Sequence, residues 1–116
     1  MGELEPLGIT VTLVEPGPTA TAFGANLEVA ETIGDYDETV RQVQKGIAEL
    51  PREAFNAPER VAAAMLAAVD AERPPLRLVT GTTAVKAIRA ALQSQLEELE
   101  AWRATSEAVD VAPAAA

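Results

Sequence analysis

Residues 8–18 read Gly-Ile-Thr-Val-Thr-Leu-Val-Glu-Pro-Gly-Pro, and this stretch decides the fold. β-Branched residues dominate it, and the side chains of residues 9–14 alternate between two uncharged faces. Two uncharged faces are typical of a strand inside a sheet that is covered on both sides. The prolines of the Pro-Gly-Pro turn at 16–18 end the strand, because proline cannot donate to a ladder. We therefore predict an interior strand over residues 8–15.

The segments on either side of this strand have helix and loop signals. Residues 3–8 resemble the last turn of a helix that proline and glycine terminate. Residues 19–34 are small and mixed, which predicts a loop with one helical turn. A helix is expected over residues 36–49, with Asp35 as its N-cap and Glu38 completing a capping box. Its apolar face has a spacing of three and four residues and consists of Tyr36, Val40, Val43, Ile47 and Leu50.

Two more helices and a second strand follow. Asn56 as N-cap and Pro58 in the first turn predict a helix over residues 57–71. Residues 76–79 have the pattern of a short strand, and residues 83–103 that of an amphipathic helix. Two strands joined by a long helical crossover are expected to be parallel. The predicted class is therefore α/β, with two parallel strands and three or four helices.

Composition and charge exclude several classes of function. Eighteen acidic and nine basic residues give a net charge of −9, which disfavours nucleic-acid binding. The chain has no apolar run of membrane-spanning length and no basic amphipathic stretch, and its first residues lack the positive charge of a signal peptide. We therefore expect a cytoplasmic protein with no membrane partner. Cysteine and histidine are both absent, which excludes thiolate chemistry, Cys/His zinc sites and Ser-His-Asp triads. No metal site is expected.

Residues 4–21 resemble the sixth strand of the short-chain dehydrogenase/reductase family of oxidoreductases, together with the loop after it. In that family a Pro-Gly pair, three residues and a threonine follow this strand, and Pro16, Gly17 and Thr21 match the pattern. The resemblance extends over about residues 1–103. It implies the C-terminal portion of a Rossmann-like doubly wound parallel sheet.

The resemblance also implies a cofactor and a reaction. Members of the family transfer hydride between NAD or NADP and a small-molecule carbonyl or alcohol substrate. Its cofactor-binding residues would be Pro16, Gly17, Thr19 and Thr21 here. Backbone groups near Thr19 would pair with the nicotinamide carboxamide, and the Thr21 hydroxyl would bond the carboxamide or a phosphate oxygen. Residues 22–52 would form the mobile substrate lid.

The chain departs from the family pattern in its reactive groups. It has no counterpart of the glycine-rich phosphate turn and none of the catalytic Ser, Tyr and Lys. The one tyrosine is Tyr36, and Val40 stands where the lysine would follow. We therefore expect no catalytic residue in this chain, and cofactor binding only together with a missing N-terminal part. By itself the chain is expected to be catalytically incomplete.

Simpler interpretations remain open for several features. Residues 16–21 are also compatible with a plain strand-ending turn, and Tyr36 with a core-facing helix residue. Residues 80–83 fit an ordinary helix start better than an anion site, and the glutamates at 97, 98 and 100 fit a solvated face. Residues 104–116 have the low complexity of a disordered tail. The alternative function is a non-catalytic interaction or oligomerisation module, and self-association or a homo-oligomer is expected in either case.

Overall fold

The computed structural model describes residues 2–113. The chain divides into two units, Met1–Val85 and Lys86–Ala116, and each is treated by itself. The first unit contains both strands, the helices α1 and α2, and the start of α3. The second contains the remainder of α3. Among the described residues, none of the helices combines the length and the hydrophobicity that crossing a bilayer requires.

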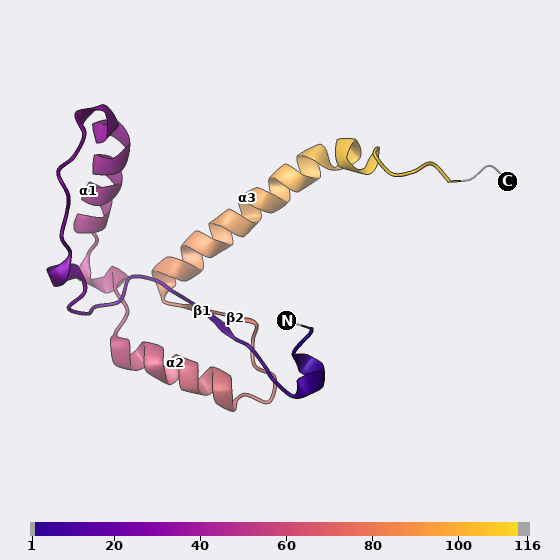
Figure 1. Ribbon diagram of the computed structural model, residues 1–116, viewed down its shortest axis with the longest axis horizontal. Helices are drawn as coiled ribbons and strands as arrows, with labels where there is room; N and C mark the ends of the chain where they lie inside the picture. Colours follow the sequence, from indigo (N-terminus) through magenta and orange to yellow (C-terminus); the bar gives the residue numbers. More distant parts are fainter. Residues whose placement is uncertain (1, 114–116) are drawn as a thin grey trace. The chain divides into compact units, whose positions relative to one another are not determined.

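The sheet of the first unit consists of two parallel strands, as the element order predicts. Strand β1 spans Leu13–Pro16 and β2 spans Arg77–Thr80. Their register places Leu13 beside Arg77 and Pro16 beside Thr80. Figure 1 shows the two strands side by side. The predicted α/β class with parallel strands is confirmed.

Strand β1 is shorter than the predicted 8–15 and begins at Leu13. The reason lies in its partner, since Pro74 and Pro75 precede β2 and have no backbone N–H to donate. The ladder therefore starts where the Leu13 N–H donates to the Leu76 carbonyl at 2.7 Å. One residue earlier, the Thr12 hydroxyl donates to the Pro75 carbonyl at 2.7 Å instead. Strand β2 is displaced by one residue from the predicted 76–79.

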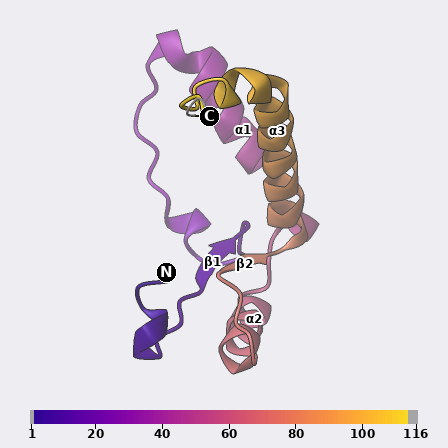
Figure 2. The ribbon, with the colours of Figure 1, turned by 90° about the vertical axis from the view of Figure 1, so that its right-hand side faces the viewer.

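Helix α2, Pro58–Asp70, lies along β2 (Figure 2). Pro58 occupies the first turn as predicted, but the N-cap is Ala57, and no side chain caps the helix. The expected N-cap Asn56 is therefore wrong. Among the larger apolar side chains of α2, Met65, Leu66 and Val69 are exposed. The less exposed positions are Val61, Ala64 and Ala68. Small alanine side chains let the helix approach the strand closely.

A long excursion, residues 20–55, connects β1 to α2. It contains the short helical turns η2 (Gly24–Asn26), η3 (Gly34–Tyr36) and η5 (Arg52–Ala54), the π-helical segment η4 (Asp37–Arg41) and the helix α1 (Gln42–Ala48). The helix expected over 36–49 is thus present, but its beginning is irregular. The predicted capping box of Asp35 and Glu38 is wrong. Asp35 lies within η3, and the N-cap residues of η3 and η4 make no side-chain hydrogen bond. Upstream of β1, the turn η1 (Glu5–Leu7) ends at Gly8, whose φ is 72°.

The second unit contains most of α3, which spans Thr82–Glu107 and ends later than the predicted residue 103. Residues 104–107 are therefore helical rather than part of a tail. Residues 111–113 have no regular secondary structure, and the rest of the expected disordered tail, 114–116, lies outside the described residues. The glutamates at 97, 98 and 100 are exposed, as expected of a solvated face.

Candidate cofactor-binding site

The carboxyl ends of β1 and β2 meet at one edge of the sheet. Pro16 and Thr80 are register partners, and the next N–H, that of Gly17, donates to the Thr80 carbonyl at 2.9 Å. Of the predicted site residues, Pro16 ends β1, and the segment 17–21, which contains Gly17, Thr19 and Thr21, leaves the sheet from this point. Open parallel sheets bind their ligands beyond the carboxyl ends of the strands. The fold therefore places the segment at the edge where such a ligand would lie.

Asn56 fastens this segment to the rest of the unit. Its N–H donates to the Pro18 carbonyl at 2.6 Å, and its carbonyl accepts from the Ala20 N–H at 3.0 Å. These two bonds form an isolated parallel bridge between Thr19 and Asn56. The Asn56 side chain also donates from Nδ2 to the Thr80 carbonyl at 2.9 Å. One residue thus links the loop after β1, the end of β2 and the approach to α2.

The turn between β2 and α3 requires glycine because of this asparagine. Gly81 has a φ of 99°, a left-handed conformation that side chains disfavour. A Cβ at this position would overlap the Asn56 side-chain amide. The Thr83 hydroxyl, one turn into α3, donates to the Ala54 carbonyl at 3.1 Å and holds the same segment from the other side. Residues 54–56 are therefore anchored to the β2–α3 turn by two side chains.

Gly17 is also constrained by packing. A Cβ built on it would lie 3.2 Å from the Ala84 Cβ and 3.4 Å from the Thr80 carbonyl oxygen. Because Gly17 has no side chain, the loop can pass the first turn of α3. This packing explains the glycine without a close approach to a flat ligand. Ala84 itself is among the few buried residues of the chain.

Thr19 and Thr21, the two threonines of the predicted site, differ in which of their hydrogen-bonding groups remain available to a ligand. In the bridge with Asn56, the bonding groups belong to Pro18 and Ala20, so the Thr19 N–H and carbonyl face the opposite side. The Thr19 hydroxyl donates to the Gly17 carbonyl at 3.1 Å. Thr21 is exposed, and its Oγ1 accepts from the Phe23 N–H at 3.3 Å. The Thr21 hydroxyl proton is thereby left to a ligand or to water.

Thr80 is the buried polar residue at the centre of this arrangement. Its side chain is 6% exposed, and its Oγ1 has no hydrogen-bond partner among the described residues. Its carbonyl accepts from both Gly17 and Asn56. Thr80 was predicted only as part of an ordinary helix start, and no periodicity connects it to Asn56, 24 residues away. Gly81 is the one residue in the sequence that could have indicated the contact between Asn56 and Thr80. The need for glycine at this position, however, follows from its contact with the Asn56 side chain in the folded structure.

A cavity of about 1000 Å³ lies within the excursion, between its extended part and α1. Apolar side chains dominate its wall, and five of them are Leu27, Val29, Ile33, Val40 and Ile47. Tyr36 also lines the cavity and is 58% exposed, so the expectation of a core-facing tyrosine is wrong. Arg41 lies at the same wall, where its guanidinium donates to the Thr32 hydroxyl at 2.7 Å.

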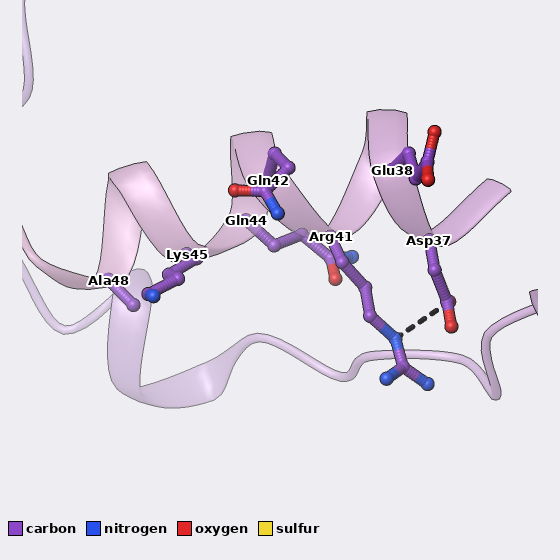
Figure 3. A pocket seen from close by; sticks show the side chains of 7 residues that line it. All are labelled: Asp37, Glu38, Arg41, Gln42, Gln44, Lys45 and Ala48. Atoms are coloured by element: carbon purple, nitrogen blue, oxygen red, sulfur yellow. Dashed lines mark ion pairs between the residues drawn. The ribbon is translucent and has the colours of Figure 1, made fainter.

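A second, more polar hollow of about 580 Å³ runs along η4 and α1 (Figure 3). Its wall is made by one apolar and six polar or charged residues, and Arg41 Nε lies 2.8 Å from Asp37 Oδ1 there. The charged side chains of this ion pair are more than a third exposed. Within residues 2–113, no group of three or more Asp, Glu, His or Cys side chains is arranged to hold a metal ion. The hollow therefore has the character of an ordinary solvated helix surface.

Known proteins match this chain over almost its whole length. No family model matches it. Oxidoreductase BOA17 of Botryotinia fuckeliana (strain B05.10) is 28% identical over 105 residues, which are 90% of this chain and 38% of that protein. The crystal structure of a short-chain dehydrogenase from Streptomyces avermitilis is similar with a TM-score of 0.78 and 33% identity.

The structural match covers 95% of this chain and 40% of the Streptomyces protein. The chain thus spans about two fifths of the length of either relative. The similarity to the Botryotinia sequence and the similarity to the Streptomyces structure both agree with the family resemblance seen in residues 4–21. The chain is thus similar in sequence and fold to a part of a short-chain dehydrogenase, in agreement with the C-terminal portion of that family's fold expected from residues 4–21.

Proposed function

We propose that this chain forms the nicotinamide side of the cofactor site and the substrate lid of an NAD- or NADP-dependent short-chain oxidoreductase. In this role it contributes binding groups and no catalytic residue. The nicotinamide dinucleotide, when bound, supplies hydride transfer to or from a carbonyl or alcohol substrate. The chain's own residues hold and orient the reacting ring and enclose the substrate.

The observation that carries this proposal is the fastening of residues 17–20 at the carboxyl edge of a parallel sheet. Gly17 is bonded to Thr80, and the backbone around Thr19 is bonded to Asn56 on one side only. The opposite side presents a free N–H and a free carbonyl from the same residue. A carboxamide has one acceptor and one donor at a matching separation, so it can pair with Thr19 as an added strand would.

The rest of the segment fits the same ligand. Pro16 and Gly17 fix the direction in which the loop leaves β1, and Gly17 lets it pass over Ala84. The exposed Thr21 hydroxyl can donate to the carboxamide or to a phosphate oxygen, because its lone pair already accepts from Phe23. Pro16, Gly17, Thr19 and Thr21 are thus the residues assigned to the cofactor.

The excursion that follows is assigned to the substrate. Its apolar cavity has the size of a pocket for a drug-sized small molecule. Of the charged residues in its wall, Glu28, Glu31 and Asp37 are acidic and Arg41 is basic. Arg41 is already paired with Asp37. An apolar, uncharged carbonyl or alcohol therefore suits the cavity better than an anion.

Catalysis would depend on elements of the family pattern that this chain does not contain. Tyr36 is the one tyrosine, and the residue four positions later is Val40, which has no ammonium group to assist proton transfer by a phenol. The phosphate-binding turn and the catalytic Ser, Tyr and Lys of the family would come from the same missing part. Turnover is assigned to the complete assembly and not to this chain alone.

A chimera tests the proposal. The chain replaces the matched segment of the Streptomyces short-chain dehydrogenase, and NADH and NADPH are titrated by fluorescence. We expect the chimera to bind one of them and the chain alone to bind neither. Substitution of Thr21→Ala in the chimera should weaken binding about fivefold to tenfold, because one hydrogen bond to the cofactor is lost.

Thr39→Ala is the matched control for this experiment. Thr39 is equally exposed, and its hydroxyl donates to the Tyr36 carbonyl at 3.1 Å within the lid. It should leave cofactor affinity unchanged. Micromolar binding of NADH or NADPH by the chain alone, or equal affinities for the Thr21 and Thr39 variants, would contradict the proposal.

A further inference from the structure

The apolar cavity within the excursion has two glutamates in its wall that no basic side chain neutralises. Glu28 and Glu31 both line the cavity, and neither forms an ion pair with a described residue. Val29 and Ala30, which lie between them in the sequence, line the same cavity. Two carboxylates therefore interrupt a wall that is otherwise apolar here.

The basic residues of the excursion do not offset these charges. Arg41 lies in the wall, but its Nε is 2.8 Å from Asp37 Oδ1. Lys45 Nζ lies 3.9 Å from Glu49 Oε1, and neither Lys45 nor Arg52 lines the cavity. With three acidic residues and one basic residue, the wall has a net charge of −2 at neutral pH. A negatively charged cavity attracts a cationic ligand and repels an anionic one.

Two aromatic rings lie in the same wall, those of Tyr36 and Phe55. An aromatic ring attracts an ammonium group placed over its face, because the π electrons make that face negative. The two residues are 58% and 37% exposed, so both have surface that a ligand can cover. Carboxylates, aromatic rings and aliphatic side chains together suit an amine that is attached to an apolar body.

We propose that the substrate carries a protonated amine in addition to its reacting carbonyl or alcohol, and is thus an apolar amino ketone or amino alcohol. This inference rests on the proposed function, which assigns the cavity to the substrate, and it adds the chemical class of that substrate. The reacting group itself is uncharged, and the amine belongs to another part of the molecule. A cavity of about 1000 Å³ has room for both groups on one apolar body.

A substrate with a carboxylate or a phosphate is the alternative that Arg41 could bind. The Arg41 guanidinium already contacts Asp37 and donates to the Thr32 hydroxyl at 2.7 Å. An anion would have to displace these contacts, and it would then lie in a cavity with two unpaired glutamates. An amine meets neither obstacle.

Three probes that share one apolar body and differ in their end group test the proposal. Phenylhexylamine, phenylhexanol and phenylhexanoate are titrated into the full-length chain and into the chimera, and the NMR shifts of the lid amides report affinity and location. At low salt we expect the amine to bind about fivefold to tenfold more tightly than the alcohol, and the carboxylate to bind most weakly. Added salt should reduce the difference, because it screens exposed charges.

The double variant Glu28→Gln with Glu31→Gln should bring the affinity for the amine down to that for the alcohol. Its matched control is Glu3→Gln with Glu5→Gln, which alters two exposed residues outside the cavity and changes the net charge equally. The control should retain the preference for the amine. Tyr36→Leu should weaken binding of the amine more than that of the alcohol, because leucine keeps an apolar contact and has no π face.

Equal affinities for the amine and the alcohol overturn the proposal. So does tighter binding of the carboxylate, or the absence of binding of all three probes to both proteins. An equal loss of preference in the control also overturns it, because net charge alone would then account for the effect. The probes bind without cofactor. A chimera that binds the amine but neither NADH nor NADPH therefore speaks against the proposed function alone, and one that binds a cofactor but does not distinguish the probes speaks against this inference alone.

Discussion

Asn56 joins three segments of this structure: the loop after β1, the end of β2 and the approach to α2. Its backbone bonds to Pro18 and Ala20, and its side chain to the Thr80 carbonyl. Without the Asn56 side chain, the Thr80 carbonyl would keep the Gly17 N–H as its donor and lose the second one. A half-buried carbonyl that loses a hydrogen bond is destabilised, because it stays out of water. The Asn56 amide therefore contributes to holding the segment 17–20 together with the backbone bonds.

Asn56→Asp tests this dependence, because it preserves the shape of the side chain and removes the donor to Thr80. We expect the two amides of Gly17 and Ala20 to exchange with deuterium about tenfold faster or more, corresponding to a loss of ~1–3 kcal/mol. Hydrogen exchange followed by NMR measures both amides. Asn26→Asp, on the exposed turn η2, is the matched control and should leave them unchanged. Equal rates in the two variants would contradict the role of Asn56.

Elements with a strong local pattern were predictable, and their ends were not. The residue types of 8–15 and 76–79 identified both strands, and the order of elements predicted that they are parallel. The start of β1 depends on Pro74 and Pro75 in the opposite strand, which no local pattern includes. The least exposed side of α2 is formed by Val61, Ala64 and Ala68, whereas its larger residues Met65, Leu66 and Val69 are exposed. Local chemistry identifies the element, and its neighbour determines which side is used.

The candidate site was likewise predictable only in part. Its four residues were named from a family pattern, and the fold places them at the sheet edge where ligands bind. The residues that hold them, Asn56, Thr80 and Gly81, were missed as a group. They are far apart in the chain, and only their contact reveals a common role.

Two glycines test what the β2–α3 turn requires. Gly81→Ala should destabilise the turn by at least ~1–2 kcal/mol, because alanine disfavours positive φ and its Cβ would overlap Asn56. Gly46→Ala lies inside α1, where nothing approaches within 4 Å, and should stabilise that helix by ~0.5–1 kcal/mol. The effect of Gly81→Ala is measured by deuterium exchange of the Val85 amide, which is bonded to the Gly81 carbonyl at 3.0 Å. The effect of Gly46→Ala is measured by exchange of the α1 amides. Similar effects for the two variants would be inconsistent with these conformations.

At the scale of the whole molecule, burial is sparse. Within residues 2–113 the buried residues are Ala68, Thr80 and Ala84, and no large side chain is fully buried. A Leu, Ile or Phe side chain contributes ~1.5–3 kcal/mol only when it leaves water, so the hydrophobic contribution to folding is small here. One edge of β1 is also without a partner strand among the described residues.

We therefore expect the chain alone to unfold over a broad temperature range. Circular dichroism should record a gradual loss of helix signal, and a neutral apolar dye such as Nile red should fluoresce strongly in its presence. In the chimera with the Streptomyces protein, the same residues should melt in one cooperative transition if the remainder of that protein buries their apolar side chains. A sharp, dye-free transition of the isolated chain would show that it is an independent domain.

The bridge between Thr19 and Asn56 closes the neck of the excursion, since the backbone leaves and returns at the same place. The segment between these two residues can therefore change in length or composition while the sheet edge remains intact. Doubling such a loop adds only ~0.6 kcal/mol of closure entropy. The proposed substrate lid can thus be exchanged as a unit, provided that Asn56 at its end and Gly81 beside that residue are retained.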